Sequence, residues 1–412
     1  MAERRRLWDE PWAWTLLALA LRVGFALLLG ERQYQTDEAS QAAAAWSLAH
    51  FHVLGFGGVA KAMPPLPGAF YAPWFAVFGQ RWLAPRLAQA CVAGLFPLVL
   101  YEMSWRLLES REGARWALRL AAVYPFYVYY SGMLMTETLD VFLSASGLLL
   151  LCLSLKDRGG DWRLAAGAGL CASLASLTRM EGAIVFLVLL TLVGLFAAVL
   201  RYSRLSWLVA TVFFALPLMG IALRDYARTG ALAVDNHGGI TFYTGTALFQ
   251  EGEVDTTVAM KRFYAGSLWP RIKDLDAAAA DRECYRAAVT FMRENPALTL
   301  WQWWRKSVNF WRLYPRVDKV YAETTYSHPG LGLKRGMLVA ISLLFEPALI
   351  FGGAYGFWRE RRRVGYTFLI PLFILGIWAA HVLTVSMMRY RLPVMAYFIL
   401  FLGASLPRRA ET

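Results

Sequence analysis

Long apolar blocks separated by short charged loops constrain this chain more than any other feature of its sequence. A helix needs about 20 mostly apolar residues to cross a bilayer. Of the 412 residues, 58% are hydrophobic and only 17% are charged, which is more apolar surface than one water-soluble core requires. The sequence therefore predicts an all-α polytopic membrane protein.

We expect about ten transmembrane helices. The predicted spans are Pro11 to Gly30, Leu83 to Met103, Ala114 to Tyr130, Leu134 to Leu155, Trp162 to Leu177, Gly182 to Leu200, Leu205 to Leu223, Gly336 to Trp358, Gly365 to Val385 and Leu392 to Leu406. The first block follows three arginines, Arg4 to Arg6, as in a signal peptide. It is longer than the apolar region of a signal peptide, about 7 to 15 residues, so we expect an uncleaved first helix.

Arginines and lysines gather in alternate loops, which indicates membrane topology. With a cytoplasmic N-terminus, the basic inner loops contain Arg106, Arg111, Arg115, Lys156, Arg158, Arg163, Arg201, Arg204, Arg359, Arg361, Arg362, Arg363, Arg408 and Arg409. Lys334 and Arg335 do not follow this pattern. A span over residues 299–315 would remove that exception but would expose the cluster near Arg361, so we predict an interfacial helix there. The net charge of +13 is explained by topology, and we expect no nucleic-acid partner.

The chain divides into three predicted parts. Residues 1–223 form an N-terminal transmembrane module whose first outer loop, residues 31–82, carries interfacial helices. Its prolines, among them Pro65 and Pro73, are expected to break continuous helix. Residues 224–335 form a modest outer-face module, and residues 336–412 form the last three transmembrane helices.

Two adjacent carboxylates, Asp37 and Glu38, follow the first span. They could act as a base at the membrane surface, or they could only cap and solubilise a short surface helix, because acidic residues suit a first helical turn. The predicted topology brings further ionisable residues to the same outer face: Glu137, Arg179, Glu181, Arg389 and Arg391. Each has a structural explanation by itself, as a helix cap, a loop ion pair or an interfacial anchor. Their convergence at the ends of apolar helices favours a binding or catalytic site.

Several motifs also carry a family resemblance. They are TDEASQAAAAW, AMPPLPGAFYAPWFAVFG, LMTETLDVFL, LTRMEGAIVF, DNHGGITFYTGTALFQEGEVD, NPALTLWQWWRKSVNFW and MMRYRLPVMAYFIL, in this order along the chain. The set resembles the bacterial C-type glycosyltransferases similar to dolichyl-phosphate-mannose protein mannosyltransferases and to the aminoarabinose transferases of lipid A. The resemblance implies the C-type glycosyltransferase fold and transfer of one sugar from a polyprenyl-phosphate carrier, with inversion, on the outer face of the membrane.

The resemblance implies that Asp37 is the general base. The chemistry of sugar transfer suggests roles for further residues. Glu38 and Glu137 are candidate catalytic carboxylates that could stabilise developing positive charge or orient the sugar hydroxyls. The predicted residues for the lipid phosphate and donor are Lys61, Arg179, Arg389, Tyr390 and Arg391. Possible substrate-binding residues are Glu181, Asn236, His237 and Tyr243. Lys61 departs from the pattern of many relatives, because Ala62 and Met63 separate it from Pro64.

The expected partners are a polyprenyl-phosphate-linked sugar, membrane lipids, and an acceptor that can be lipid, polysaccharide or protein. We expect a bacterial inner (plasma) membrane protein with both termini in the cytoplasm. The four cysteines and five histidines show no metal-ligand spacing, so we expect no cofactor, although an acidic site for a divalent ion stays possible.

Two alternatives remain open. A flippase or secondary transporter would carry ionisable residues inside its spans, where Arg22, Asp140 and Glu346 are the candidates. The second alternative is an enzyme that transfers a whole oligosaccharide or a phosphorylated lipid group.

Overall fold

The computed structural model describes residues 10–34, 36–53, 64–157, 160–230, 232, 234, 238–248, 256–314, 335–361 and 366–406. These residues fold into helices, and no strand occurs among them. The predicted all-α class is confirmed.

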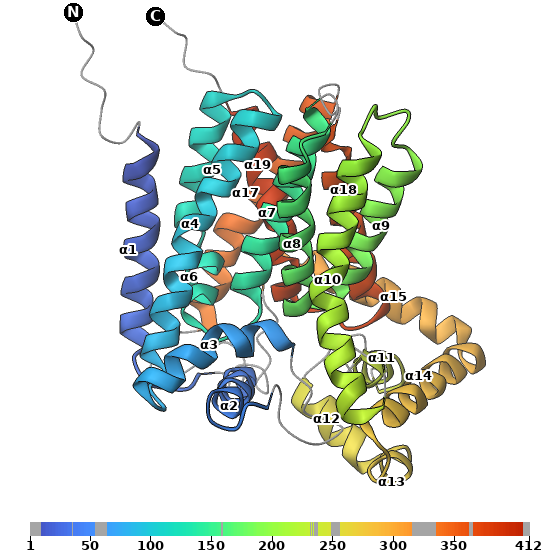
Figure 1. The fold of residues 1–412 in the computed structure, drawn as a ribbon. Helices are drawn as coiled ribbons and strands as arrows, with labels where there is room; N and C mark the ends of the chain where they lie inside the picture. Colours follow the sequence, from blue (N-terminus) through green and yellow to red (C-terminus); the bar gives the residue numbers. More distant parts are fainter. Residues whose placement is uncertain are drawn as a thin grey trace, which may run out of the picture.

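One group of helices stands side by side in a bundle (Figure 1). They are α1 (Pro11–Leu29), α4 (Leu83–Leu107), α5 (Arg111–Val123), α6 (Pro125–Gly132), α7 (Glu137–Lys156), α8 (Trp162–Thr178), α9 (Glu181–Leu195), α10 (Arg204–Thr229), α17 (Arg335–Glu360), α18 (Leu369–Leu383) and α19 (Leu392–Ser405). Two short 3-10 helices, η4 (Tyr366–Phe368) and η5 (Met388–Arg391), precede α18 and α19.

The remaining helices lie at the lower end of the bundle in Figure 1. They are α2 (Thr36–Phe51), α3 (Pro65–Phe78), α11 (Gly238–Ala247), α12 (Thr256–Ala265), α13 (Trp269–Ile272), α14 (Ala277–Glu294) and α15 (Pro296–Phe310). We call α11 to α15 the outer module. Its small core includes Ile240, Phe263, Ile272 and Cys284.

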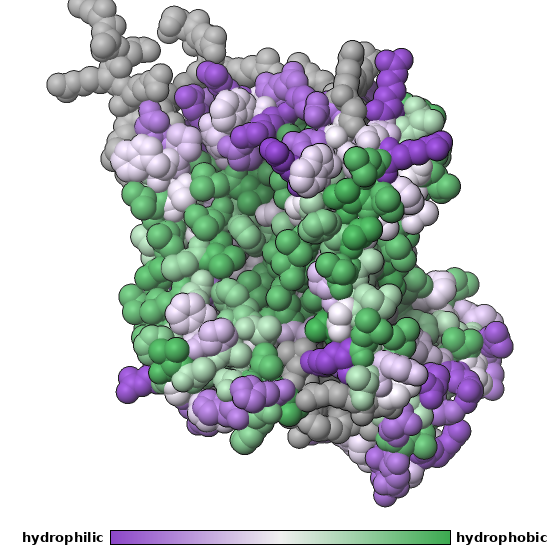
Figure 2. Space-filling model, in the orientation of Figure 1, coloured by the Kyte–Doolittle hydropathy of each residue, from purple (hydrophilic) through white to green (hydrophobic). Residues whose placement is uncertain are grey.

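A broad apolar belt crosses the face of the bundle that Figure 2 shows, with hydrophilic side chains gathered above and below it. Large apolar side chains point outward from the bundle helices, for example Leu28 (69% exposed), Ile184 (68%), Leu344 (71%) and Phe351 (65%). Such exposure would be unfavourable in water and suits contact with lipid. The protein is a multi-pass membrane protein.

Within the part of the chain that the structure describes, length and composition qualify five helices as membrane spans: α1, α4, α7, α10 and α17. Helices α9 and α18 are apolar but shorter. The number of ten spans stays a prediction. The expectation of one helix over Ala114 to Tyr130 is wrong, because the chain breaks at Tyr124, which has an extended backbone (φ −59°, ψ 117°) before Pro125. Proline disfavours helical geometry in the residue before it.

The expectation that prolines would interrupt the segment before Gly79 is also wrong. Helix α3 runs without a break from Pro65 to Phe78 and contains Pro73. Pro65 is at the start of the helix, where its missing N–H costs nothing. The apolar face of α3 packs on α2 through Tyr71, Ala72 and Phe75, and this packing offsets the hydrogen bond that Pro73 cannot make.

Small residues allow the bundle helices to approach closely. A Cβ at Gly353 or Gly356 in α17 would overlap the backbone of α19, and a Cβ at Gly169 in α8 would overlap the carbonyl of Ala210 in α10. Close backbone contact of this kind supplies the van der Waals packing that holds helices together in lipid.

Candidate active site

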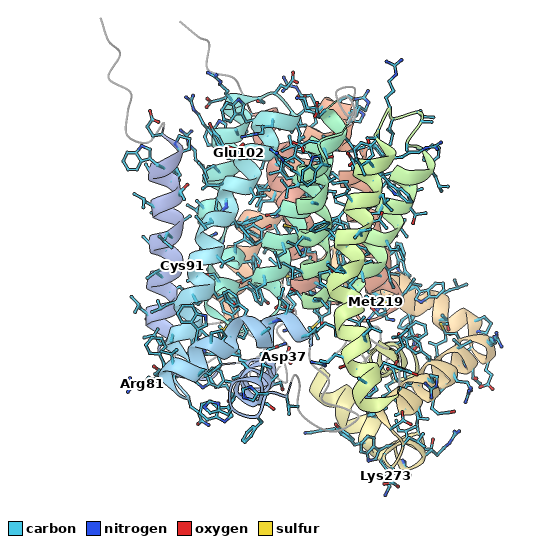
Figure 3. The ribbon with its side chains drawn as sticks, viewed as in Figure 1. Asp37, Arg81, Cys91, Glu102, Met219 and Lys273 are labelled. Carbon is cyan, nitrogen blue, oxygen red and sulfur yellow. The ribbon has the colours of Figure 1, made fainter. Side chains whose placement is uncertain are left out.

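The first turn of α2 presents Asp37 at the lower end of the bundle. Figure 3 shows it at the same end as Arg81 and Lys273 and opposite Glu102. Its side chain is 47% exposed. A helix N-terminus favours a negative charge at this position, so the carboxylate is both stabilised and open to solvent.

Arg389 holds one oxygen of that carboxylate. This arginine lies in η5, and its Nη2 donates to Oδ2 of Asp37 at 2.8 Å. The side chain of Arg389 is only 9% exposed, and its Nε lies 3.4 Å from Oε1 of Glu137. Burial by itself would lower the pKa of Arg389, but the nearby acidic groups, first Tyr390 and then Asp37 and Glu137, outweigh it and raise this pKa.

Glu137, at the start of α7, lies between two arginines. Its carboxylate is 2% exposed and lies 3.6 Å from Nη1 of Arg179, besides its contact with Arg389. Arg179 caps α8 and donates to Oε1 of Glu181 at 2.8 Å. Burial opposes the charge on Arg179, but Glu181 and Glu137 outweigh it and raise its pKa, so both arginines stay cationic.

Aromatic rings stack beneath these charges. The guanidinium of Arg179 lies 4.3 Å from the centre of the Tyr390 ring. The ring centre of His381 is 4.6 Å from that of Tyr390, and the two rings are inclined by 17°. Nε2 of His381 lies 3.6 Å from Oε1 of Glu181. Cation–π contact and stacking fix the orientation of Arg179.

We call Asp37, Glu137, Arg179, Glu181 and Arg389 the rim cluster. The sequence predicted these residues as site residues, and the structure brings all of them together from the starts of α2, α7 and α9, the end of α8, and η5. Tyr390, also predicted, packs against the cluster. His381 was not predicted, because a lone histidine in an apolar stretch gives no local signal.

Glu38 differs from its neighbour Asp37. Its side chain is fully buried and pairs with Arg86 of α4 at 2.8 Å. It also accepts from the backbone N–H groups of Tyr34 at 2.8 Å and Leu134 at 3.0 Å. Glu38 therefore lies inside the protein and joins the start of α2 to α4 and to the segment between α6 and α7. Arg86 is a second residue that the sequence analysis missed, although an arginine within an apolar span was an available signal.

Arg391 is buried in the same way. Its Nη2 pairs with Glu346 of α17 at 2.5 Å, and its Nη1 donates to the carbonyl of Phe310 at 2.9 Å and to that of Arg312. Tyr124 donates to the second oxygen of Glu346. Arg391 thus joins α17, the end of α15 and the break between α5 and α6.

Three predicted residues, Lys61, Asn236 and His237, lie outside the described residues. Tyr243 is described and lies in α11, where its ring packs edge-on against Phe263 at 6.1 Å. It belongs to the core of the outer module and not to the rim cluster. Within the described part of the chain, no group of three or more His, Cys, Asp or Glu residues could hold a metal ion. Metal independence stays a prediction.

Residues 62–221 match the model of the dolichyl-phosphate-mannose-protein mannosyltransferase family. The chain resembles that family. The family resemblance predicted from the motifs is thereby confirmed over this part, which contains Glu137, Arg179 and Glu181 of the rim cluster. Among curated proteins, none matches the chain.

Two solved structures are similar to the chain at low identity. One is the crystal structure of ArnT from Cupriavidus metallidurans bound to undecaprenyl phosphate, at 14% identity and a TM-score of 0.46, with 95% of this chain and 58% of that chain covered. The other is the same protein in the apo state, at 12% identity and a TM-score of 0.40, with 95% and 76% covered. The chain thus spans little more than half the length of the first of these proteins.

Proposed function

We propose that this protein is an integral-membrane glycosyltransferase that moves one sugar from a polyprenyl-phosphate carrier to an acceptor hydroxyl on the outer face of the membrane. One observation carries the proposal: an exposed carboxylate, Asp37, is held by a buried arginine in a cluster of charges at one end of an apolar bundle. The family match over residues 62–221 supports the reaction class and a lipid-phosphate donor.

In the proposed reaction, Asp37 is the general base. Its Oδ2 is held by Arg389, and the side chain is 47% exposed, so the carboxylate is open to an acceptor hydroxyl. The hydroxyl gives its proton to Asp37 while its oxygen attacks the anomeric carbon of the sugar. The bond from that carbon to the phosphate oxygen breaks, and the polyprenyl phosphate leaves. A single displacement of this kind inverts the anomeric centre.

The other charged residues position this base and the substrate. We assign Glu137 to holding Arg389 and Arg179 in place, because both guanidiniums lie within 3.6 Å of its carboxylate. Glu38 orients the start of α2 through its buried contacts with Arg86 and the backbone. Arg179 and Arg389 are partly engaged by carboxylates, and they stabilise negative charge near the leaving phosphate.

The flippase or transporter alternative depends on ionisable residues inside the spans. Two of the three candidates are occupied with protein contacts: Arg22 donates to the carbonyls of Ala18, Ala121 and Ala122, and Glu346 pairs with Arg391. No observation on the described residues favours transport over transfer.

The test of the proposed function is Asp37→Asn. Asparagine keeps the shape and still accepts from Arg389, but it cannot take up the proton. With a purified polyprenyl-phosphate-linked sugar as donor, turnover should fall by about a hundred- to ten-thousand-fold, the usual contribution of general base catalysis, while the donor KM changes little. The matched control is Asp274→Asn, an exposed aspartate of the outer module, which should keep full turnover. Equal turnover in Asp37→Asn and wild type would refute the mechanism.

A further inference from the structure

Helix α15 carries a lysine on its buried face. The buried residues of this helix are Thr299, Gln302, Lys306 and Phe310, whereas Leu300 and Trp304 are 62% and 67% exposed. Lys306 is 1% exposed. Lysine is almost never fully buried unless it is paired, so its position requires an explanation.

The backbone around Lys306 is held firmly. Ser386 Oγ donates to the carbonyl of Lys306 at 2.8 Å, and Asn309 Nδ2 donates to the carbonyl of Ser386 at 2.7 Å. One turn away, Gln302 Nε2 donates to the carbonyl of Thr246 in α11 at 3.1 Å. Lys306 therefore lies where α15 meets α11 and the segment between α18 and η5.

The ammonium group of Lys306 has no hydrogen-bond partner among the described residues. Burial lowers its pKa to about 7, since the charged form is disfavoured when nothing compensates for lost water. A methionine of similar length would fill the same space without this cost. An unpaired buried amine that destabilises the fold suggests a role in binding.

The rim cluster itself has no excess of positive charge. Asp37, Glu137 and Glu181 contribute three carboxylates, whereas Arg179 and Arg389 contribute two guanidiniums. Arg391 is neutralised by Glu346. A phosphate that enters this site needs a further cation.

Lys306 is connected to the rim cluster through the chain that follows α18. Ser386, which bonds to its carbonyl, lies three residues before Arg389. Phe310, one turn further along α15, has its ring centre 6.1 Å from that of His381, the ring that stacks on Tyr390. The buried face of α15 thus borders the segment that positions Arg389.

We propose that the Lys306 ammonium binds the phosphate of the lipid-linked donor. This rests on the proposed function. The phosphate supplies the partner that the ammonium lacks, and the lysine supplies the positive charge that the rim cluster lacks. Lysine binds phosphate as a point charge, so the site selects for charge more than for the identity of the sugar.

The binding experiment compares undecaprenyl phosphate with undecaprenol, which lacks the phosphate. The full-length protein is placed in nanodiscs of phosphatidylcholine, and the affinity of each lipid is measured by titration. Wild type should prefer the phosphate form. Lys306→Met should lose about ten- to hundredfold of that preference, the range of a charge-assisted hydrogen bond, and Lys306→Arg should keep part of it. Lys273→Met, which removes an exposed lysine of the outer module, should keep it all.

Thermal unfolding of the same variants supplies an independent readout. Lys306→Met should unfold at a higher temperature than wild type, because it removes an unpaired buried amine. A lower unfolding temperature would mean that the ammonium has a protein partner, which would overturn the proposal. A lysine with a merely structural role would change stability and leave lipid preference intact.

The arms of the binding experiment separate three kinds of failure. If wild type binds both lipids equally, the proposed carrier-phosphate function is wrong. If wild type prefers undecaprenyl phosphate and Lys306→Met keeps the full preference, only the assignment of Lys306 is wrong. If phosphatidylglycerol added to the nanodiscs competes as well as undecaprenyl phosphate, the site binds membrane phosphates in general, and its assignment to the donor is overturned.

Discussion

The rim cluster and the buried ion pairs are built from the same residue types and differ in their exposure. In the rim cluster, Asp37 is 47% exposed, and the carboxylate of Glu137 is shared by two arginines. In the pair of Glu38 and Arg86, both side chains are fully buried, and the carboxylate also accepts from two backbone N–H groups.

This difference separates two uses of charge in one protein. A buried pair whose carboxylate is held by several hydrogen bonds fixes how helices meet, and that carboxylate has little capacity left for a ligand. A cluster that is partly open and shares its partners can exchange a protein contact for a substrate contact. For this reason Asp37 belongs to the rim cluster, whereas its neighbour Glu38 belongs to a buried ion pair.

The largest effect that should distinguish the two classes is on stability. Glu38→Gln leaves Arg86 as a buried charge without its counter-ion, and breaking a buried pair costs about 3 to 5 kcal/mol. Thermal unfolding in detergent should show this loss, while the turnover of the folded fraction should fall less than in Asp37→Asn, because Glu38 only orients the start of α2. The control is Glu102→Gln, the same change in an exposed pair with Arg106, which should cost less than about 1 kcal/mol. Equal stability of the two variants would mean that the buried pair does not hold the fold.

A smaller effect is expected at Arg179, and it should appear in activity. Arg179→Lys keeps the charge but loses the planar fork that reaches both Glu137 and Glu181. We expect kcat/KM to fall by about ten- to hundredfold, corresponding to one charge-assisted hydrogen bond. Steady-state kinetics with a purified donor measures it, and full activity in Arg179→Ala would return this residue to the role of a loop ion pair.

The smallest effect is expected at His381, where a ring can be replaced by a ring. His381→Phe keeps the stack on Tyr390 and loses the contact with Glu181. His381→Ala loses both, and an aromatic pair contributes about 0.5 to 1.5 kcal/mol. Turnover should therefore fall only a few-fold in His381→Phe and further in His381→Ala. Equal losses in the two variants would show that the imidazole, and not the stack, positions the rim cluster.

The sequence by itself determined the class of the protein and the composition of its rim cluster. Apolar blocks can be recognised from sequence because lipid requires them locally, and the alternation of basic loops orders their ends. These two rules were enough to bring Asp37, Glu137, Arg179, Glu181 and Arg389 to one face before any contact was known. The family resemblance came from motifs that are also local.

Only the tertiary structure decided which charged residues are exposed. Glu38 and Asp37 look alike in the sequence, but one residue along a helix is a rotation of about 100°, which turns Glu38 toward Arg86 and Asp37 toward Arg389. The same is true of Arg391, which meets Glu346, and of Lys306, which meets no partner among the described residues. Pairing depends on residues far apart in the chain, and no local pattern specifies such contacts.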